Sequence, residues 1–116
     1  MTDPKAHILF VCGKNQWRSP TAERLYRGDG RVDVRSAGVS ARSRHQISAA
    51  DIGWADLILV MEEDHKARIL EQFRSLALPA MESLDIPDEY EYMDDELVDL
   101  IRGGVEARIE ALLRSR

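Results

Sequence analysis

Cys12-Gly13-Lys14-Asn15-Gln16-Trp17-Arg18-Ser19-Pro20 is the segment from which the fold can be worked out. It follows an apolar run at residues 7–11, which is typical of a buried strand. It leads into residues 20–27, which favour a helix with Ser19 as N-cap, Pro20 at the first helical position and Glu23 in the first turn. The pattern therefore predicts a strand, a short loop and a helix, with a cysteine where the strand ends and an arginine where the helix begins.

The spacing between Cys12 and Arg18 suits the binding of a tetrahedral oxyanion. A loop of this length can point its backbone N–H groups inward, and the helix N-terminus adds its positive end. A guanidinium binds two oxygens of such an anion at once. Helix N-termini and nearby cations favour a thiolate, which is an activated nucleophile beside a bound phosphate. The alternative is a buried structural cysteine beside a surface arginine.

The motif Cys-x5-Arg-Ser-Pro-x-Ala-Glu, from Cys12 to Glu23, resembles the opening of the low-molecular-weight protein tyrosine phosphatase family. Arsenate reductases of the same fold share this opening. A second match is Ala-Asp-Leu-Ile-Leu-Val-Met at residues 55–61, followed by His65. The resemblance is to a short, bacterial-type member with a single cysteine. It implies a three-layer α/β fold, in which a four-stranded parallel sheet of order 2-1-3-4 has helices on both faces. The site is then expected at the carboxyl ends of the strands.

The resemblance also implies roles for individual residues. Cys12 is expected to be the nucleophile, Arg18 to stabilise the phosphoryl oxygens, and Asp88 to be the general acid. The family has Asp-Pro-Tyr where this chain has Asp88-Glu89-Tyr90, so the acid-bearing loop departs from the family pattern. Ser36 is expected to support Asn15. The residues expected to bind substrate are Gly13, Lys14, Asn15, Gln16, Trp17, Ser19 and Tyr90.

Three further aspartates lie near Asp88 in the sequence. Asp94 and Asp95 are better explained as charges at the N-terminus of the last helix. Asp85 lies close to a predicted strand and has a structural interpretation. Asp88 is therefore the preferred acid.

The segment after Gly38 is shorter than in the family, because longer relatives carry an additional helix there. The family's loop-supporting histidine falls at Arg42, and whether Arg42 replaces it is left open. Arg42 and Arg44 either attract an anionic substrate or form a solvated basic loop. His45 is expected at the surface, and His65 is expected to be structural.

Strand and helix signals alternate along the rest of the chain, which favours an α/β fold. Strands are expected at 32–36, 57–61 and 80–84. Helices are expected at 49–52, capped by Ser48, at 62–73 with Ala67, Ile69, Leu70 and Phe73 available for a core face, and from about 93 to 113. The last helix carries an apolar stripe at helical spacing, formed by Leu97, Ile101, Val105, Ile109 and Leu112.

Length and composition limit the possible classes of protein. A chain of 116 residues predicts a single domain over 1–116, and 44% hydrophobic with 32% charged residues is typical of a soluble globular protein. A net charge of −5 argues against nucleic acid as a partner, and no apolar run is long enough to cross a membrane. A single cysteine and no signal peptide predict a cytoplasmic protein without an internal disulfide. No metal site or cofactor is expected, and the sequence makes no prediction of an oligomeric state.

The expected function is hydrolysis of a phosphate monoester, either a phosphotyrosine protein or a small aryl phosphate, through a phosphocysteine. One alternative is an arsenate reductase that uses an external thiol, since thioredoxin-coupled versions need resolving cysteines that this chain lacks. The others are a phosphocarrier and a non-catalytic phosphate-binding module.

Overall fold

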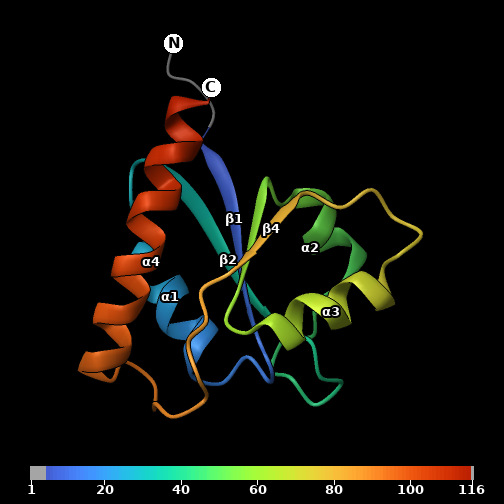
Figure 1. Ribbon diagram of the computed structural model, residues 1–116, viewed down its shortest axis with the longest axis horizontal. Coiled ribbons are helices and arrows are strands. Elements are labelled where there is room, and N and C mark those ends of the chain that lie inside the picture. Colours follow the sequence, from blue (N-terminus) through green and yellow to red (C-terminus); the bar gives the residue numbers. More distant parts are fainter. Residues whose placement is uncertain (1–4, 116) are drawn as a thin grey trace.

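The computed structural model describes residues 5–115 and is built around a parallel sheet of four strands. The strands are β1 (Ala6–Cys12), β2 (Val32–Gly38), β3 (Leu57–Val60) and β4 (Ala80–Ser83). Their order is β2-β1-β3-β4, and each neighbouring pair is parallel (Figure 1). The predicted sheet and its strand order are confirmed.

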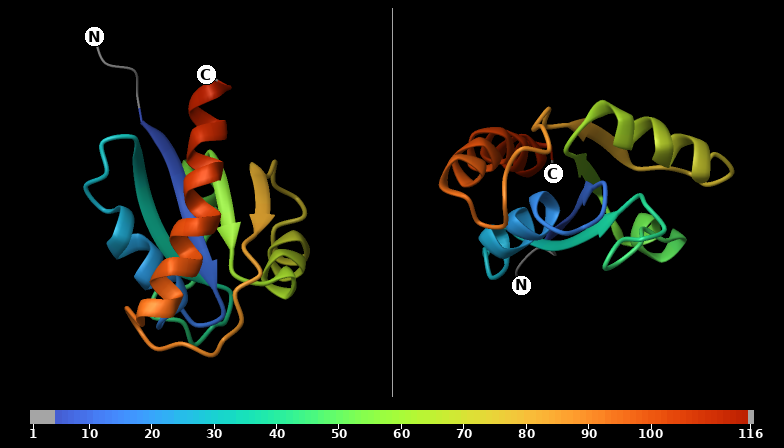
Figure 2. Two further views of the ribbon diagram at one scale, coloured as in Figure 1. Left: turned by 60° about the vertical axis from the view of Figure 1, so that its left-hand side comes forward. Right: turned by 90° about the horizontal axis from the view of Figure 1, so that it is seen from below.

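Four helices cover the two faces of this sheet. They are α1 (Arg18–Tyr26), α2 (Ala49–Trp54), α3 (Glu63–Gln72) and α4 (Asp95–Arg114). Figure 2 shows α1 and α4 on one face and α2 and α3 on the other, which gives the predicted three layers.

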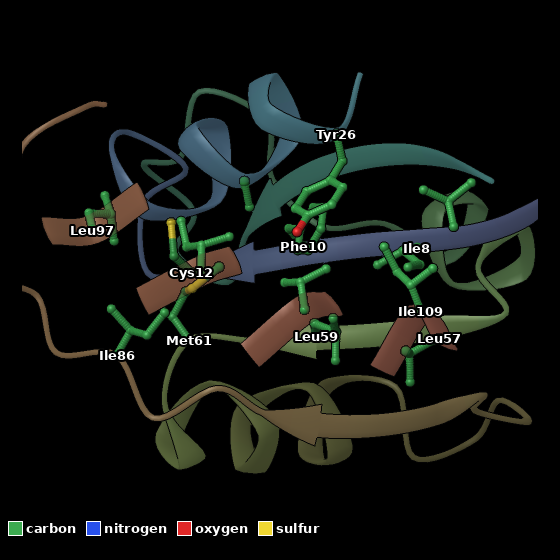
Figure 3. Packing of buried hydrophobic residues seen from close by; sticks show 14 of the residues in the cluster. Ile8, Phe10, Cys12, Tyr26, Leu57, Leu59, Met61, Ile86, Leu97 and Ile109 are labelled. Carbon is green, nitrogen blue, oxygen red and sulfur yellow. The ribbon is translucent and has the colours of Figure 1, made fainter. Parts of the chain in front are cut away.

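Strand β1 is central because it pairs with β2 on one edge and with β3 on the other. Its side chains alternate between the two faces, so that Phe10 and Cys12 join the core under α1 and α4, while Leu9 and Val11 join the core under α2 and α3. A strand covered on both faces has an almost continuous apolar sequence, as this one does. Figure 3 shows Cys12 at the carboxyl end of the strand, still among core side chains.

Helix α4 packs through the predicted apolar stripe. Leu97, Ile101, Val105 and Ile109 are fully buried, and Leu112 is half-buried. Each fully buried aliphatic side chain contributes about 1.5–3 kcal/mol relative to exposure, so this stripe holds α4 on the sheet. The Asp94 carboxylate caps the helix by accepting hydrogen bonds from the N–H groups of Glu96 and Leu97.

The predicted start of α1 is wrong. The helix begins at Arg18 with Trp17 as N-cap, and no side chain caps it. Ser19 and Pro20 lie inside the first turn, and Glu23 lies beyond it. The physical reason is that the Ser19 hydroxyl contacts Cys12 and Asn15 instead of the helix end.

The core face of α3 is narrower in the structure than the sequence predicts. Ile69 is fully buried and Phe73 is half-buried, but Ala67 and Leu70 are exposed. The helix covers the β3–β4 edge of the sheet, where a narrow stripe is enough for packing. None of the helices in residues 5–115 combines the length and the apolar character needed to cross a bilayer.

Candidate active site

The loop between β1 and α1 is oriented by its carbonyl groups. The carbonyl oxygens of Cys12, Gly13 and Lys14 accept hydrogen bonds from the N–H groups of Val39, Ser40 and Arg44, at 3.0, 2.9 and 3.2 Å. The N–H groups of residues 13–18 donate no hydrogen bond to the rest of the described chain. With its carbonyls turned toward residues 39–44, the loop presents its N–H groups as a nest for an anion.

Asn15 fixes the curvature of this loop. Its φ of 54° lies in the left-handed region, which asparagine tolerates better than most residues. The buried side chain donates from Nδ2 to Ser19 Oγ at 2.9 Å and to Ser36 Oγ at 3.0 Å. Ser36 in turn donates to Glu23 Oε1 at 2.7 Å. The contact between Ser36 and Asn15 expected from the resemblance is therefore present, while Arg42 lies exposed to solvent.

Gly38, the last residue of β2, allows the closest approach to the loop. A Cβ at this position would lie 2.8 Å from the backbone nitrogen of Asn15 and would collide with the side chain of Ser43. Real Cβ atoms essentially never come this close to a backbone atom. Glycine at this position is thus required by the shape of the loop.

Cys12 lies at the base of the loop with its thiol beside a hydroxyl. Its Sγ is 2.9 Å from Ser19 Oγ, and both residues are buried. A thiolate can only accept a hydrogen bond, so in that form of Cys12 the Ser19 hydroxyl is the donor. A charged acceptor makes such a bond stronger than a neutral pair does.

The Arg18 guanidinium is buried and compensated by two carboxylates. Its Nη1 donates to the carbonyl of Ile86 at 2.8 Å and lies 3.2 Å from Glu62 Oε2. Its Nε lies 3.6 Å from Asp88 Oδ1. A buried cation without compensation is strongly destabilising, so these carboxylates stabilise Arg18 when no anion is bound.

His65 connects this arrangement to α3. Its Nδ1 accepts from the N–H of Glu62 at 3.1 Å, so the proton is on Nε2, which lies 3.4 Å from Glu62 Oε2. Burial, and then the positive charge of Arg18, lower the pKa of His65. The ring is therefore neutral at neutral pH.

Glu62 was not identified from the sequence, where it was assigned only to the start of a helix. A signal was available, because Glu62 follows the strand that pairs with β1. The carboxyl ends of parallel neighbours meet at one edge, which brings the Glu62 side chain to Arg18.

A cavity of about 340 Å³ opens over the loop. It brings together the three residues expected to be catalytic, Cys12, Arg18 and Asp88. The other residues that line it are Gly13, Lys14, Gln16, Trp17, Glu62 and His65.

Tyr90, expected to bind substrate, is not brought to this cavity. It is half-buried and packs against the core on the α1 and α4 face. The chain then turns at Met93, whose φ is 62° and whose N–H donates to Thr21 Oγ1 at 2.9 Å. Tyr92, rather than Tyr90, lines a second pocket beside the loop.

Of the four neighbouring aspartates, Asp88 is the one that lines the cavity. Asp85 accepts a hydrogen bond from Ser83 Oγ at 2.8 Å and is thereby tied to the end of β4. Asp94 caps α4, and Asp95 lies in the first turn of that helix. The Asp88 side chain is 61% exposed, so it can reach a ligand in the cavity.

Within residues 5–115, no group of three His, Cys, Asp or Glu side chains is arranged to hold a metal ion. The polar groups of the cavity include the guanidinium of Arg18, the carboxylates of Glu62 and Asp88, the thiol of Cys12 and the backbone nest, together with the side chains of Lys14, Gln16 and His65.

Solved structures of phosphatases resemble this chain over most of its length. The YwlE arginine phosphatase from Geobacillus stearothermophilus is 28% identical, with 92% of this chain and 96% of that chain covered at a TM-score of 0.67. The low-molecular-weight protein tyrosine phosphatase SP-PTP from Streptococcus pyogenes is 20% identical, with 92% and 93% covered at a TM-score of 0.76. The tyrosine phosphatase Wzb from Escherichia coli K30, in complex with phosphate, is 24% identical, with 94% and 99% covered at a TM-score of 0.71.

No family model and no curated protein sequence matches the chain. The structural neighbours nevertheless confirm the resemblance to low-molecular-weight protein tyrosine phosphatases that the motif around Cys12 indicates. The neighbour that is 28% identical supports a phosphatase, and the two that are less similar support the fold.

Proposed function

We propose that this chain hydrolyses phosphate monoesters, with phosphotyrosine in a protein as the substrate. The observation that carries the proposal is one cavity lined by a thiol, a buried guanidinium and an accessible carboxylate, over a loop whose N–H groups are unpaired within the described chain. Trp17, which is 43% exposed at the rim of this cavity, offers an aromatic face to the ring of phosphotyrosine.

In the first step the Cys12 thiolate attacks phosphorus. An S–P bond forms while the bond from phosphorus to the tyrosine oxygen breaks, and protonated Asp88 gives its proton to that oxygen. The loop N–H groups and Arg18 stabilise the charge on the three equatorial oxygens. A bound phosphate replaces Glu62 and Asp88 as the anion facing Arg18.

In the second step water attacks the phosphocysteine. The Asp88 carboxylate takes a proton from the water, the new O–P bond forms, and the S–P bond breaks. Phosphate leaves, and Cys12 returns as a thiolate with Ser19 as its hydrogen-bond donor.

Hydrolysis explains the site better than the alternatives do. A phosphocarrier or a binding module has no need of an acid, yet Asp88 lies 3.6 Å from Arg18 at the cavity. An arsenate reductase would depend on a thiol from outside, since Cys12 is the single cysteine of the chain.

Phosphoarginine is the second candidate substrate. The neighbour that is 28% identical is an arginine phosphatase. Glu62 and Asp88 also put two carboxylates on the wall of the cavity, where a substrate guanidinium would be attracted.

Initial rates on a phosphotyrosine peptide, a phosphoarginine peptide and a small aryl phosphate test the proposal. The wild-type protein should release phosphate from the tyrosine peptide without any added thiol, and acid quench should trap a phosphocysteine. Cys12→Ser should lower the rate by about 10⁴–10⁶-fold, as when the nucleophile of other covalent enzymes is removed. Turnover of arsenate with glutathione, without phosphate release from any ester, would replace the proposal with a reductase.

A further inference from the structure

A second pocket of about 530 Å³ adjoins the candidate active site. The two share Gln16 and Trp17, so these side chains separate the phosphate position from the second pocket. We call this second space the flank pocket. The residues on which the argument rests are Gln16, Trp17, Arg27, Arg44 and Tyr92.

The flank pocket differs in charge from the active-site cavity. The charged residues that line the flank pocket are Arg27, Arg44 and Glu23. In the active-site cavity, Glu62 and Asp88 are balanced by Lys14 and Arg18. The chain as a whole has a net charge of −5, so the basic character belongs to this side of the site and not to the overall charge.

Arg44 supplies most of the available charge. It is exposed and forms no ion pair within the described chain, while its backbone N–H is fixed to the carbonyl of Lys14 at 3.2 Å. Arg27 is also exposed, and its guanidinium lies 3.8 Å from Glu23, which offsets part of its charge. The nearby His45 is bonded to Asp51 at 2.9 Å.

Two exposed aromatic rings complete the flank pocket. Trp17 and Tyr92 are 43% and 42% exposed, and both line it. Tryptophan, tyrosine and arginine are the residue types that contribute most to protein interfaces. The combination fits a polypeptide segment better than it fits an inorganic ion.

We propose that the flank pocket binds the residues next to the phosphorylated side chain of a protein substrate, and that it selects acidic ones. This inference deepens the proposed function and rests on it, since the phosphorylated residue must occupy the adjoining cavity. An acidic side chain is attracted to Arg44 and Arg27, which outnumber the one carboxylate of this pocket, Glu23. It would be repelled by Glu62 and Asp88 in the active-site cavity.

The test compares phosphotyrosine peptides that differ only in the charge beside the phosphotyrosine. Peptides with acidic, neutral or basic neighbours are assayed, and the ratios of their kcat/KM values are taken so that general effects cancel. The acidic peptide should exceed the neutral one by roughly two- to tenfold, the range expected for one or two solvent-exposed ion pairs. High salt should reduce this ratio toward one.

Variants of two arginines on the same loop test whether the preference for the acidic peptide comes from Arg44. Arg44→Gln should remove most of the acidic preference, and Arg44→Glu should shift it toward the basic peptide. Arg42→Gln is the control, because Arg42 is exposed on the same loop but lines neither pocket. If Arg42→Gln and Arg44→Gln lost the preference for the acidic peptide equally, the cause would be general attraction by a basic loop. That result would overturn the proposal for the flank pocket.

A binding measurement tests this inference independently of the proposed function. Affinities of the same peptides for Cys12→Ser are measured by titration calorimetry, which needs no turnover. If the wild-type protein hydrolyses no ester but the acidic peptide still binds more tightly in an Arg44-dependent way, the hydrolase proposal fails and the flank pocket stands. If esters are hydrolysed but all three peptides bind Cys12→Ser with equal affinity, the proposal that the flank pocket selects acidic residues is overturned.

Discussion

The segment at residues 12–19, which contains the loop between β1 and α1, meets the loop at residues 84–94 at Arg18, but the two are held in different ways. In the first, the carbonyls bond to residues 39–44, and Asn15, Ser19 and Ser36 form a buried polar network. In the second, most side chains are exposed, and the loop is attached at a few points, including the Ile86 carbonyl and the N–H of Met93. Groups that stabilise charge need fixed positions. The group that delivers a proton must instead reach different leaving groups.

Among the variants that compare the two loops, the largest loss is expected when the proposed acid, Asp88, is replaced. Asp88→Asn keeps the size of the side chain but cannot donate an acidic proton, so turnover of a phosphotyrosine peptide should fall by about 10²–10⁴-fold. A nitrophenyl phosphate should lose much less, because its leaving group needs no proton. Rapid-quench measurement of phosphoenzyme formation on both substrates checks this.

Asp85→Asn is the matched control for that variant, since Asp85 lies on the same loop but is tied to Ser83. Small, equal losses in Asp88→Asn on both substrates, together with a large loss in Asp85→Asn, would transfer the acid to Asp85.

A change at Arg18, in the segment at residues 12–19, should not depend on the leaving group in the way that the loss in Asp88→Asn does. Arg18→Lys keeps the charge but loses the planar pair of donors, so kcat/KM should fall by about 10²–10³-fold, the cost of removing one oxyanion donor. The loss should be similar for the phosphotyrosine peptide and for the nitrophenyl ester, because charge on the equatorial oxygens develops with either. Inhibition by phosphate should weaken in parallel. Full activity with unchanged phosphate inhibition would exclude a role for the guanidinium fork.

A variant at Gly38 tests the effect of the loop's backbone position without replacing any of its polar side chains. Gly38→Ala introduces a Cβ 2.8 Å from the Asn15 nitrogen, so the loop must shift, and kcat/KM should fall by about 10- to 100-fold. Gly53→Ala is the control, because a Cβ there meets nothing within 4 Å. Thermal unfolding of both variants tells a displaced loop from a destabilised fold. Equal activities in the two variants would argue against the close approach.

The smallest effect should be on the pH dependence of stability. Burial and Arg18 lower the pKa of His65 in the folded chain, so the unfolded chain binds this proton more readily. The free energy of unfolding should therefore decrease as pH falls through about 6.5, the ordinary pKa of histidine. In His65→Gln, urea unfolding between pH 7.5 and pH 5 should show a weaker decrease. An unchanged slope would mean that His65 does not contribute it.

The two loops also differ in how far the sequence predicts them. Local patterns were sufficient for β3 and α4, because Leu57–Val60 is apolar throughout and α4 has a regular stripe. The strand order of the sheet was predicted from the family resemblance and not from these patterns. They were also sufficient to place Cys12 and Arg18 together, since a short loop leaves little choice. The start of α1 was mispredicted because Ser19 has two possible uses, and its contacts with Cys12 and Asn15 prevail over capping.

Contacts between distant segments were harder to predict. Glu62 has an ordinary helix-start sequence, and its approach to Arg18 arises from the pairing of β1 with β3. The resemblance predicts Tyr90 at the cavity, because the aromatic residue of the family's Asp-Pro-Tyr lines the mouth of the pocket. Asp88 lines the cavity, whereas Tyr90, two positions later, packs against the core, and no periodic pattern indicates this difference.

The hydrogen bond from Arg18 to the Ile86 carbonyl spans 68 positions of the sequence, and this separation has a consequence for biosynthesis. The ribosome makes Cys12 and its loop early, but Ile86 and Asp88 are added only after all four strands have been translated. A nascent chain that ends at β4 therefore carries the thiol and the guanidinium without the acid. Emergence of the last quarter of the chain, including α4, is what brings the Ile86 carbonyl and Asp88 to Arg18.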